Sequence, residues 1–194
     1  MPRRIVILRH GESAHNAARL WQGQSDSELS PRGVEQARVA ARALAGAGVT
    51  RVVASDLRRA AHTGRAVADA AGVPLEIEPA FREIGVGRWE GLHHDDVARD
   101  DPDLMRRLEA FEDVAWGHTG ERPSDVLARV ARAGAALADT LDDGQCAVVA
   151  THGVAGPQLA ASLLGEDPEP LIRREGILGN ARWIAIEDAG GGWR

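Results

Sequence analysis

The sequence predicts an α/β protein with a mostly parallel sheet. Residues 4–8, 49–54 and 145–150 are short apolar runs, typical of strands that are buried on both faces. Segments with helical periodicity lie between these runs, so strands and helices alternate along the chain. The 194 residues suit one domain, which we expect to span residues 1–194.

The first two helices have recognisable ends. Ser30 and Pro31 are a favoured cap and first-turn pair, and a helix is predicted to start there. Its apolar residues fall on one face: Val34, Ala37, Ala41 and Leu44. The second helix covers residues 57–71 and ends at Gly72, and a short strand follows at 75–77.

The chain from 83 to 122 is irregular and rich in glycine and acidic residues, which predicts loops and short helices. We expect this segment to cover a site as a lid or insertion. Pro123 and Ser124 start another long helix, with one apolar face: Val126, Val130, Leu137 and Leu141. A helix at 154–164, a solvated loop at 166–170 and a strand at 181–186 complete the chain.

Composition excludes several classes of chemistry. The sequence has no lysine, so it has neither a P-loop lysine nor a Schiff-base lysine. Cys146 is the only cysteine, which excludes an intrachain disulfide and a thiolate metal cluster. His93 and His94 are adjacent and would not face one point on a helix, so we expect no metal there.

Charge and hydropathy limit the partners and the location. The net charge of −6 argues against nucleic acid as a partner. No apolar run approaches the ~20 residues that span a bilayer, so we expect no membrane partner. The first eight residues are too short for a signal peptide, which predicts a cytoplasmic protein.

Charged and nucleophilic residues follow three of the predicted strands. Arg9 and His10 follow the first strand, Arg59 lies shortly after the second, and His152 follows the strand at 145–150. Ligands of parallel sheets bind at the carboxyl ends of the strands. Core packing does not require two histidines and several arginines at one edge, so we expect a binding or catalytic site there.

These residue types suit phosphoryl transfer. A neutral imidazole at His10 is a good nucleophile, and a covalent step divides hydrolysis into two easier ones. The phosphoryl group needs fixed positive charge and hydrogen-bond donors, which Arg9, Arg59 and His152 can supply. Glu83 is the candidate acid for the leaving oxygen. Each residue alone has an ordinary structural role as its alternative, and the joint pattern favours the site.

The sequence resembles the histidine phosphatase superfamily, in its phosphoglycerate mutase-like branch, over nearly the whole chain. Four motifs carry the resemblance: Leu8-Arg9-His10-Gly11-Glu12 with Asn16; Ser55-Asp56-Leu57-Arg58-Arg59-Ala60 with Thr63; Arg82-Glu83-Ile84-Gly85 with Gly87-Arg88-Trp89-Glu90-Gly91; and Thr151-His152-Gly153. The resemblance implies a three-layer α/β/α sandwich with a mostly parallel mixed sheet.

The resemblance also implies roles. His10 would carry the phosphoryl group and Glu83 would donate the proton, with no cofactor and no metal. The phosphate and substrate would be bound by Arg9, Asn16, Gln22, Gly23, Arg59 and His152. The same resemblance suggests a homodimer.

The substrate is expected to be a small phosphomonoester, such as a sugar or glycerate phosphate. The segment Gly87–Gly91 resembles the phosphatase members, and the segments around Trp21 and Asn180 resemble actinobacterial phosphatases of glucosyl-3-phosphoglycerate. The segment 119–122 departs from the family pattern ahead of the long helix. A phosphoglycerate mutase-type phosphotransferase remains an alternative, as does a catalytically inactive binding module, although all four central residues are present.

Overall fold

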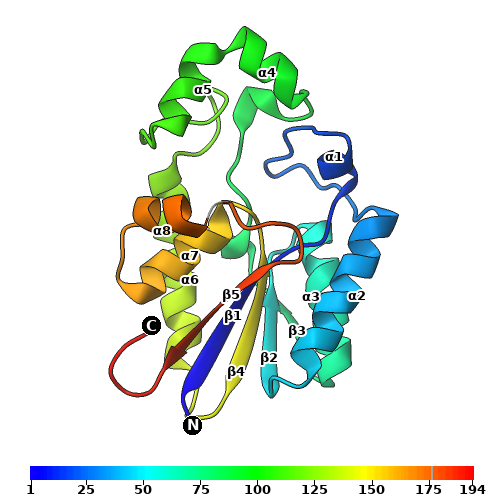
Figure 1. Cartoon of the computed structure of the whole chain (residues 1–194), viewed down its shortest axis with the longest axis vertical. Coiled ribbons are helices and arrows are strands. Elements are labelled where there is room, and N and C mark those ends of the chain that lie inside the picture. The colour runs from blue at the N-terminus through cyan, green and yellow to red at the C-terminus, as the bar shows by residue number, and fades with distance from the viewer. Residues whose placement is uncertain (176) are drawn as a thin grey trace.

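The computed structural model describes residues 1–175 and 177–194. Its sheet has five strands in the order β3-β2-β4-β1-β5 (Figure 1). The parallel strands are β1 (Arg3–Arg9), β2 (Val49–Ala54), β3 (Leu75–Ile77) and β4 (Cys146–Thr151). The edge strand β5 (Trp183–Asp188) runs antiparallel to β1 and begins two residues later than predicted.

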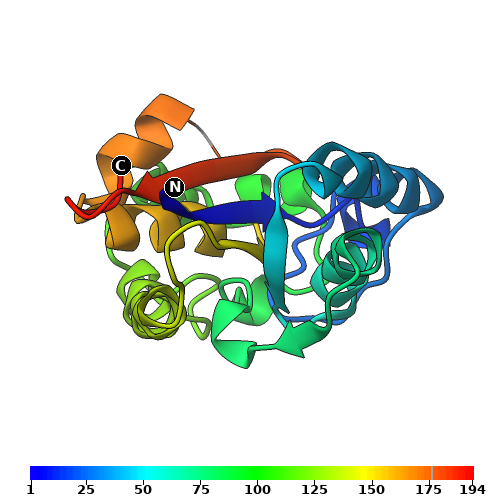
Figure 2. The same ribbon diagram turned by 90° about the horizontal axis from the view of Figure 1, so that it is seen from below.

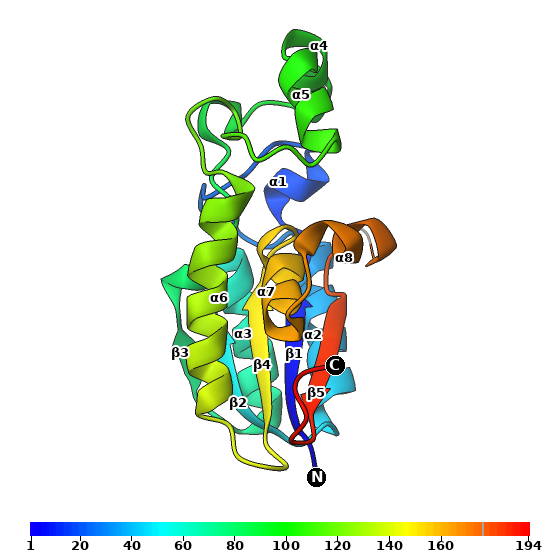
Figure 3. The same ribbon diagram turned by 90° about the vertical axis from the view of Figure 1, so that its left-hand side faces the viewer.

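Helices cover both faces of the sheet, which confirms the predicted α/β/α arrangement (Figure 2). On one face, α2 (Pro31–Ala45) packs against α3 (Arg58–Ala71). On the other, α6 (Pro123–Asp139) packs against α7 (Ala155–Leu164). Figure 3 shows α6 and α7 in front of the strands.

Local chemistry explains where these helices begin and end. The Ser30 hydroxyl accepts the Gly33 N–H at 3.0 Å and caps α2 as predicted. Gly72 ends α3 with φ of 69°, a left-handed conformation that glycine adopts without the steric cost of a Cβ.

Short elements follow the carboxyl ends of the parallel strands, and the helices α1, α4 and α5 among them lie in the upper part of Figure 1. Their bounds are α1 (Ala14–Ala17), η1 (Pro79–Phe81), η2 (Gly87–Trp89), α4 (His94–Asp100) and α5 (Pro102–Glu109). Two of them are the 3₁₀ helices η1 and η2. The elements that fall within residues 83–122 are short helices, as predicted for that segment.

The prediction of a solvated loop at residues 166–170 was wrong. Pro168 begins α8 (Pro168–Glu175). Proline suits the first turn of a helix, and Glu169 forms an ion pair with Arg173 one turn later at 2.8 Å. Leu171 is buried in the core, so one apolar contact holds a helix whose other residues are mostly polar.

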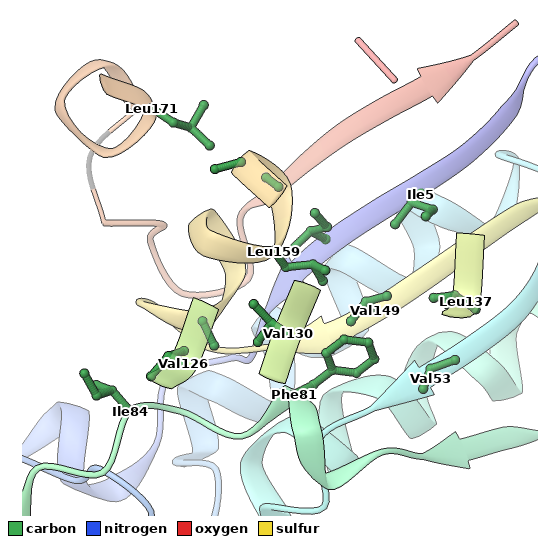
Figure 4. Packing of buried hydrophobic residues seen from close by; sticks show 14 of the residues in the cluster. Ile5, Val53, Phe81, Ile84, Val126, Val130, Leu137, Val149, Leu159 and Leu171 are labelled. Atoms are coloured by element: carbon green, nitrogen blue, oxygen red, sulfur yellow. The ribbon is translucent and has the colours of Figure 1, made fainter. Parts of the chain in front are cut away.

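Two apolar clusters sandwich the sheet. Ile5 and Ile7 belong to the cluster under α6 and α7, whereas Val6 and Leu8 belong to the cluster under α2 and α3. The alternation follows from the two-residue period of a strand. Figure 4 shows the first cluster, in which Phe81 lies beside Val130 of α6. No helix of the described chain is long and apolar enough to cross a membrane.

Candidate active site

The two histidines are positioned by neighbouring central strands. Arg9 of β1 is paired with Thr151 of β4, and His10 and His152 are the next residues of these strands. The His10 N–H donates to the Thr151 carbonyl at 3.0 Å. The two rings have centroids 5.2 Å apart at 62°, and their residues are only 1% and 0% exposed. The parallel register therefore brings both imidazoles together at the carboxyl ends of these two strands.

The proton of His10 is assigned by its hydrogen bond. Nδ1 lies 2.6 Å from the carbonyl oxygen of Gly11. A carbonyl oxygen only accepts, so Nδ1 must carry the hydrogen. Nε2 therefore keeps its lone pair, and no described residue forms a hydrogen bond with it. This tautomer is the one that a nucleophilic imidazole needs.

The surroundings keep His10 neutral. Burial lowers its pKa well below 6.5, and the positive charges of Arg59 and Arg9 lower the pKa further. The backbone next to His10 is fixed as well, because the Gly11 N–H donates to Thr63 Oγ1 at 3.1 Å. A Cβ on Gly11 would lie 2.3 Å from the Gly33 carbonyl oxygen, so only glycine fits this close approach.

Arg59 enters the site from the first turn of α3. Its Nη1 and Nη2 donate to the carbonyls of Ser25 and Gly23, both at 2.8 Å. Burial lowers its pKa to about 10, and it stays protonated at neutral pH. Burial also lowers the pKa of Arg9, whose Nη1 donates to the Leu178 carbonyl. Backbone oxygens thus hold both guanidinium groups in place.

His152 is oriented by Ser55, which follows β2. Its Nε2 lies 2.9 Å from the Ser55 hydroxyl. Burial lowers the pKa of His152 well below 6.5, and Arg59 and His10 lower the pKa further. The imidazole is therefore a neutral hydrogen-bonding group.

Three nitrogen atoms in the cluster are buried without a partner among the described residues. They are Arg9 Nε, Arg59 Nε and His152 Nδ1. An unsatisfied buried donor costs about 1–3 kcal/mol. An oxyanion that accepted from these nitrogens would remove that cost, so the cluster has the chemistry of an anion site beside His10 Nε2.

Glu83 lies at the N-terminus of α7. Its carboxylate accepts the Val154 N–H at 3.1 and 3.2 Å and the Ala155 N–H at 3.1 Å. Its negative charge acts on both Arg9 and Arg59, which places it in the same electrostatic cluster. The Glu83 side chain is partly buried.

Arg129 of α6 holds the backbone that carries Glu83. Nη1 donates to the carbonyls of Ala80 and Arg82, both at 2.7 Å, and Nη2 donates to the Glu83 carbonyl at 3.0 Å. Glu121 accepts from Nε and Nη2 of Arg129, each at 3.0 Å. A single guanidinium thus fixes the loop before and at the candidate acid.

Asn16 and Gln22 lie at the outer side of the cluster. The Asn16 side-chain oxygen accepts from Asn180 Nδ2 at 3.1 Å, and the same Nδ2 donates to the His10 carbonyl at 3.2 Å. Gln22 Oε1 accepts from the Ser13 hydroxyl at 2.7 Å. Gly23 contributes its carbonyl to Arg59.

Three residues of the site lay outside the sequence prediction: Ser55, Arg129 and Asn180. Ser55 stands inside a motif that carries the family resemblance, and Asn180 lies in a segment that resembles the actinobacterial phosphatases, so their positions were a signal. Arg129 lies in the middle of a long helix, 46 residues from Glu83, and no local pattern distinguishes it from a surface arginine.

The described residues contain no group of three or more His, Cys, Asp or Glu side chains that could hold a metal ion. His93 instead caps α4, accepting the Asp95 N–H on Nδ1 at 3.3 Å.

Comparison with known proteins shows similarity to one superfamily over most of the chain. A sequence profile described as the histidine phosphatase superfamily (branch 1) matches residues 5–194. The chain is 37% identical to a glucosyl-3-phosphoglycerate phosphatase of Mycolicibacterium vanbaalenii, over 95% of this chain and 84% of the other. It is 36% identical to a probable phosphoglycerate mutase of Enterobacter sp., over 83% of this chain and 74% of the other.

Solved structures are similar over nearly the whole chain. A mycobacterial glucosyl-3-phosphoglycerate phosphatase in complex with VO3 superposes with a TM-score of 0.89 at 34% identity, covering 99% of this chain and 96% of the other. The alpha-ribazole phosphatase of Shigella flexneri gives a TM-score of 0.82 at 28% identity, covering 98% and 93%.

Proposed function

The chain belongs to the histidine phosphatase superfamily, as its motifs predicted, and we propose that it hydrolyses a small phosphomonoester through a phosphohistidine on His10. It is an enzyme of the phosphatase class. The observation that carries the proposal is the His10 Nδ1–H bond to Gly11, because it leaves Nε2 nucleophilic beside three unpartnered nitrogens.

The proposed first step forms a P–N bond. His10 Nε2 attacks phosphorus, the ester P–O bond breaks, and Glu83 gives its proton to the leaving oxygen. Arg9, Arg59 and His152 hold the phosphoryl oxygens during transfer. In the second step Glu83 takes a proton from water, the water oxygen attacks phosphorus, and the P–N bond breaks to release inorganic phosphate.

The relatives suggest where to look for the substrate. Two relatives are named for the phosphatase reaction on glucosyl-3-phosphoglycerate, so sugar and glycerate phosphates are the first class to assay. We also propose that Asn16, Gln22 and Gly23 line the phosphate side of the site and that residues 83–122 form its lid. A cytoplasmic homodimer remains a proposal.

A mutase-type transfer is the second candidate, because relatives named as phosphoglycerate mutases match 83% of the chain. A mutase moves the phosphoryl group between two hydroxyls, whereas a phosphatase releases inorganic phosphate to water.

The first test is release of phosphate from p-nitrophenyl phosphate with EDTA present, comparing wild type with His10→Ala. Loss of the nucleophile should lower kcat by at least about 10³-fold, while EDTA should have no effect. His62→Ala is a control at an exposed histidine. Full activity in His10→Ala would overturn the assignment of the nucleophile, and a wild type that transfers phosphate but releases none would favour the mutase.

A further inference from the structure

A cavity of about 490 Å³ lies among α5, α6, α7 and α8. Its wall includes Trp21 and Trp116 together with aliphatic side chains from three helices, among them Leu108, Leu127 and Ile172. The Trp21 and Trp116 rings meet edge to face at 5.7 Å. Volume and lining are those of a site for a small organic molecule.

The cavity adjoins the catalytic cluster. Gly153 and Val154 line it, and they directly follow His152. The Val154 N–H is bound to the Glu83 carboxylate. A Cβ on Gly153 would lie 3.3 Å from the Arg9 guanidinium carbon, so phosphate site and cavity share a wall. The part of a substrate beyond its ester oxygen would therefore enter this cavity.

The charge of the lining opposes an anionic group. Four solvent-exposed carboxylate residues lie among those that line the cavity: Glu109, Glu112, Asp113 and Glu169. Two of them are paired with arginines outside the lining, Glu112 with Arg107 at 2.6 Å and Glu169 with Arg173 at 2.8 Å. No arginine or histidine within residues 1–175 and 177–194 lines it. A carboxylate on the leaving group would lose water here without gaining a cation, which is costly.

Away from these exposed carboxylates, polar groups in the wall are few. Trp21 Nε1, Trp116 Nε1 and Gln158 Oε1 are buried there, with no hydrogen-bond partner in the part of the chain that the structure describes. A hexose carries a hydroxyl on nearly every carbon, and those directed at the inner wall would mostly stay unpaired. An apolar ring with one or two hydrogen-bonding groups fits the lining better.

We propose that this cavity binds the leaving group of the substrate and selects an uncharged, mainly apolar group that contains a ring. The inference rests on the proposed phosphatase function and narrows its substrate class. It assigns substrate choice to residues contributed by α5, α6 and α8, away from the atoms that react.

The test compares substrates whose leaving oxygens are all on alkyl carbon, so that leaving-group reactivity differs little. They are 2-phenylethyl phosphate, glycerol 3-phosphate and 3-phosphoglycerate. Burial of the phenyl ring should give 2-phenylethyl phosphate a kcat/KM roughly 10- to 100-fold above that of glycerol 3-phosphate. 3-Phosphoglycerate should be the poorest of the three.

Two variants of α6 locate the effect. Leu127→Glu places a charge in the cavity wall, whereas Ala128→Glu places the same charge on the exposed neighbouring position. Leu127→Glu should bring 2-phenylethyl phosphate to within about threefold of glycerol 3-phosphate, since a charged wall disfavours an apolar ring. Ala128→Glu should keep the preference. A circular-dichroism spectrum and a melting temperature like those of the wild type show that each variant is folded.

Two results would overturn the proposal: 3-phosphoglycerate as the best substrate, or an equal effect of Leu127→Glu on all three esters. Tryptophan fluorescence of His10→Ala, titrated with 2-phenylethyl phosphate, separates this failure from that of the phosphatase itself. Binding to His10→Ala that disappears when Leu127→Glu is added would support the cavity. If the wild type also hydrolysed none of the three esters, the phosphatase proposal alone would be contradicted. If 2-phenylethyl phosphate did not bind to His10→Ala, the proposed role of the cavity would be overturned and the phosphatase proposal would stand.

Discussion

At the scale of single residues, His152 depends on one hydroxyl for its orientation. Ser55 is fully buried and gives His152 Nε2 its hydrogen bond, while Nδ1 has no partner among the described side chains. If Ser55 donates to Nε2, the hydrogen of the ring sits on Nδ1, where a phosphate oxygen can accept it. Ser55 would then act on phosphate without touching it.

Ser55→Ala should therefore raise the inhibition constant of inorganic phosphate about tenfold, the equivalent of one hydrogen bond. The measurement is competitive inhibition by phosphate, together with ¹⁵N chemical shifts of the His152 ring, which report its tautomer. Ser162→Ala is the same substitution in α7, where the hydroxyl bonds only to the Leu159 carbonyl. An unchanged constant and unchanged shifts in Ser55→Ala would remove Ser55 from the site.

At the scale of elements, α6 carries a positioning residue for a loop that lies far from it in sequence. Arg129 bonds to three successive parts of the chain that leads to Glu83. Its removal would free this loop without changing the nucleophile. The consequence should appear in the step that needs the acid.

Arg129→Met should lower kcat for alkyl phosphates roughly 10- to 100-fold, because small displacements of a catalytic group are costly. p-Nitrophenyl phosphate should be less affected, since its leaving group needs little protonation. Steady-state kinetics with both ester types measure the difference, and Arg132→Met on the exposed side of α6 is the control. An equal loss on both esters would indicate a general structural role instead.

The elements differ in how far sequence predicts them. The strands and long helices follow from apolar runs, Ser30 with Pro31, and Gly72, since these signals are local. The helix at Pro168 was missed because its stability depends on the burial of Leu171, a tertiary contact. The clustering of His10, Arg59 and His152 was predictable, because all three follow the ends of parallel strands. The role of Arg129 and the apolar cavity were not predictable, because both arise from packing between segments distant in sequence.

At the scale of the whole molecule, the buried neutral histidines link stability to pH. His10 and His152 both have a pKa below 6.5 in the folded state, chiefly because of burial. Below pH 6.5 the unfolded chain binds protons that the folded chain does not, so folding becomes less favourable as pH falls. Above pH 6.5 this penalty is absent.

The free energy of unfolding should therefore fall between pH 6.5 and 5, by up to about 1.4 kcal/mol per pH unit for each of these histidines. Urea titrations in phosphate-free buffers measure it. His10→Ala should reduce the pH dependence of the free energy of unfolding by the contribution of one histidine. His62→Ala is the matched control at an exposed position. A stability that stays constant from pH 7.5 to 5 would show that the two rings are protonated when folded.

The pairing of Arg9 with Thr151 has an evolutionary consequence. The nucleophile and its neighbouring histidine directly follow two adjacent inner strands, where almost any substitution disturbs one of the two cores. The walls of the cavity belong to surface helices that tolerate replacement. Mutation can thus explore new substrates after gene duplication while the chemistry is inherited intact.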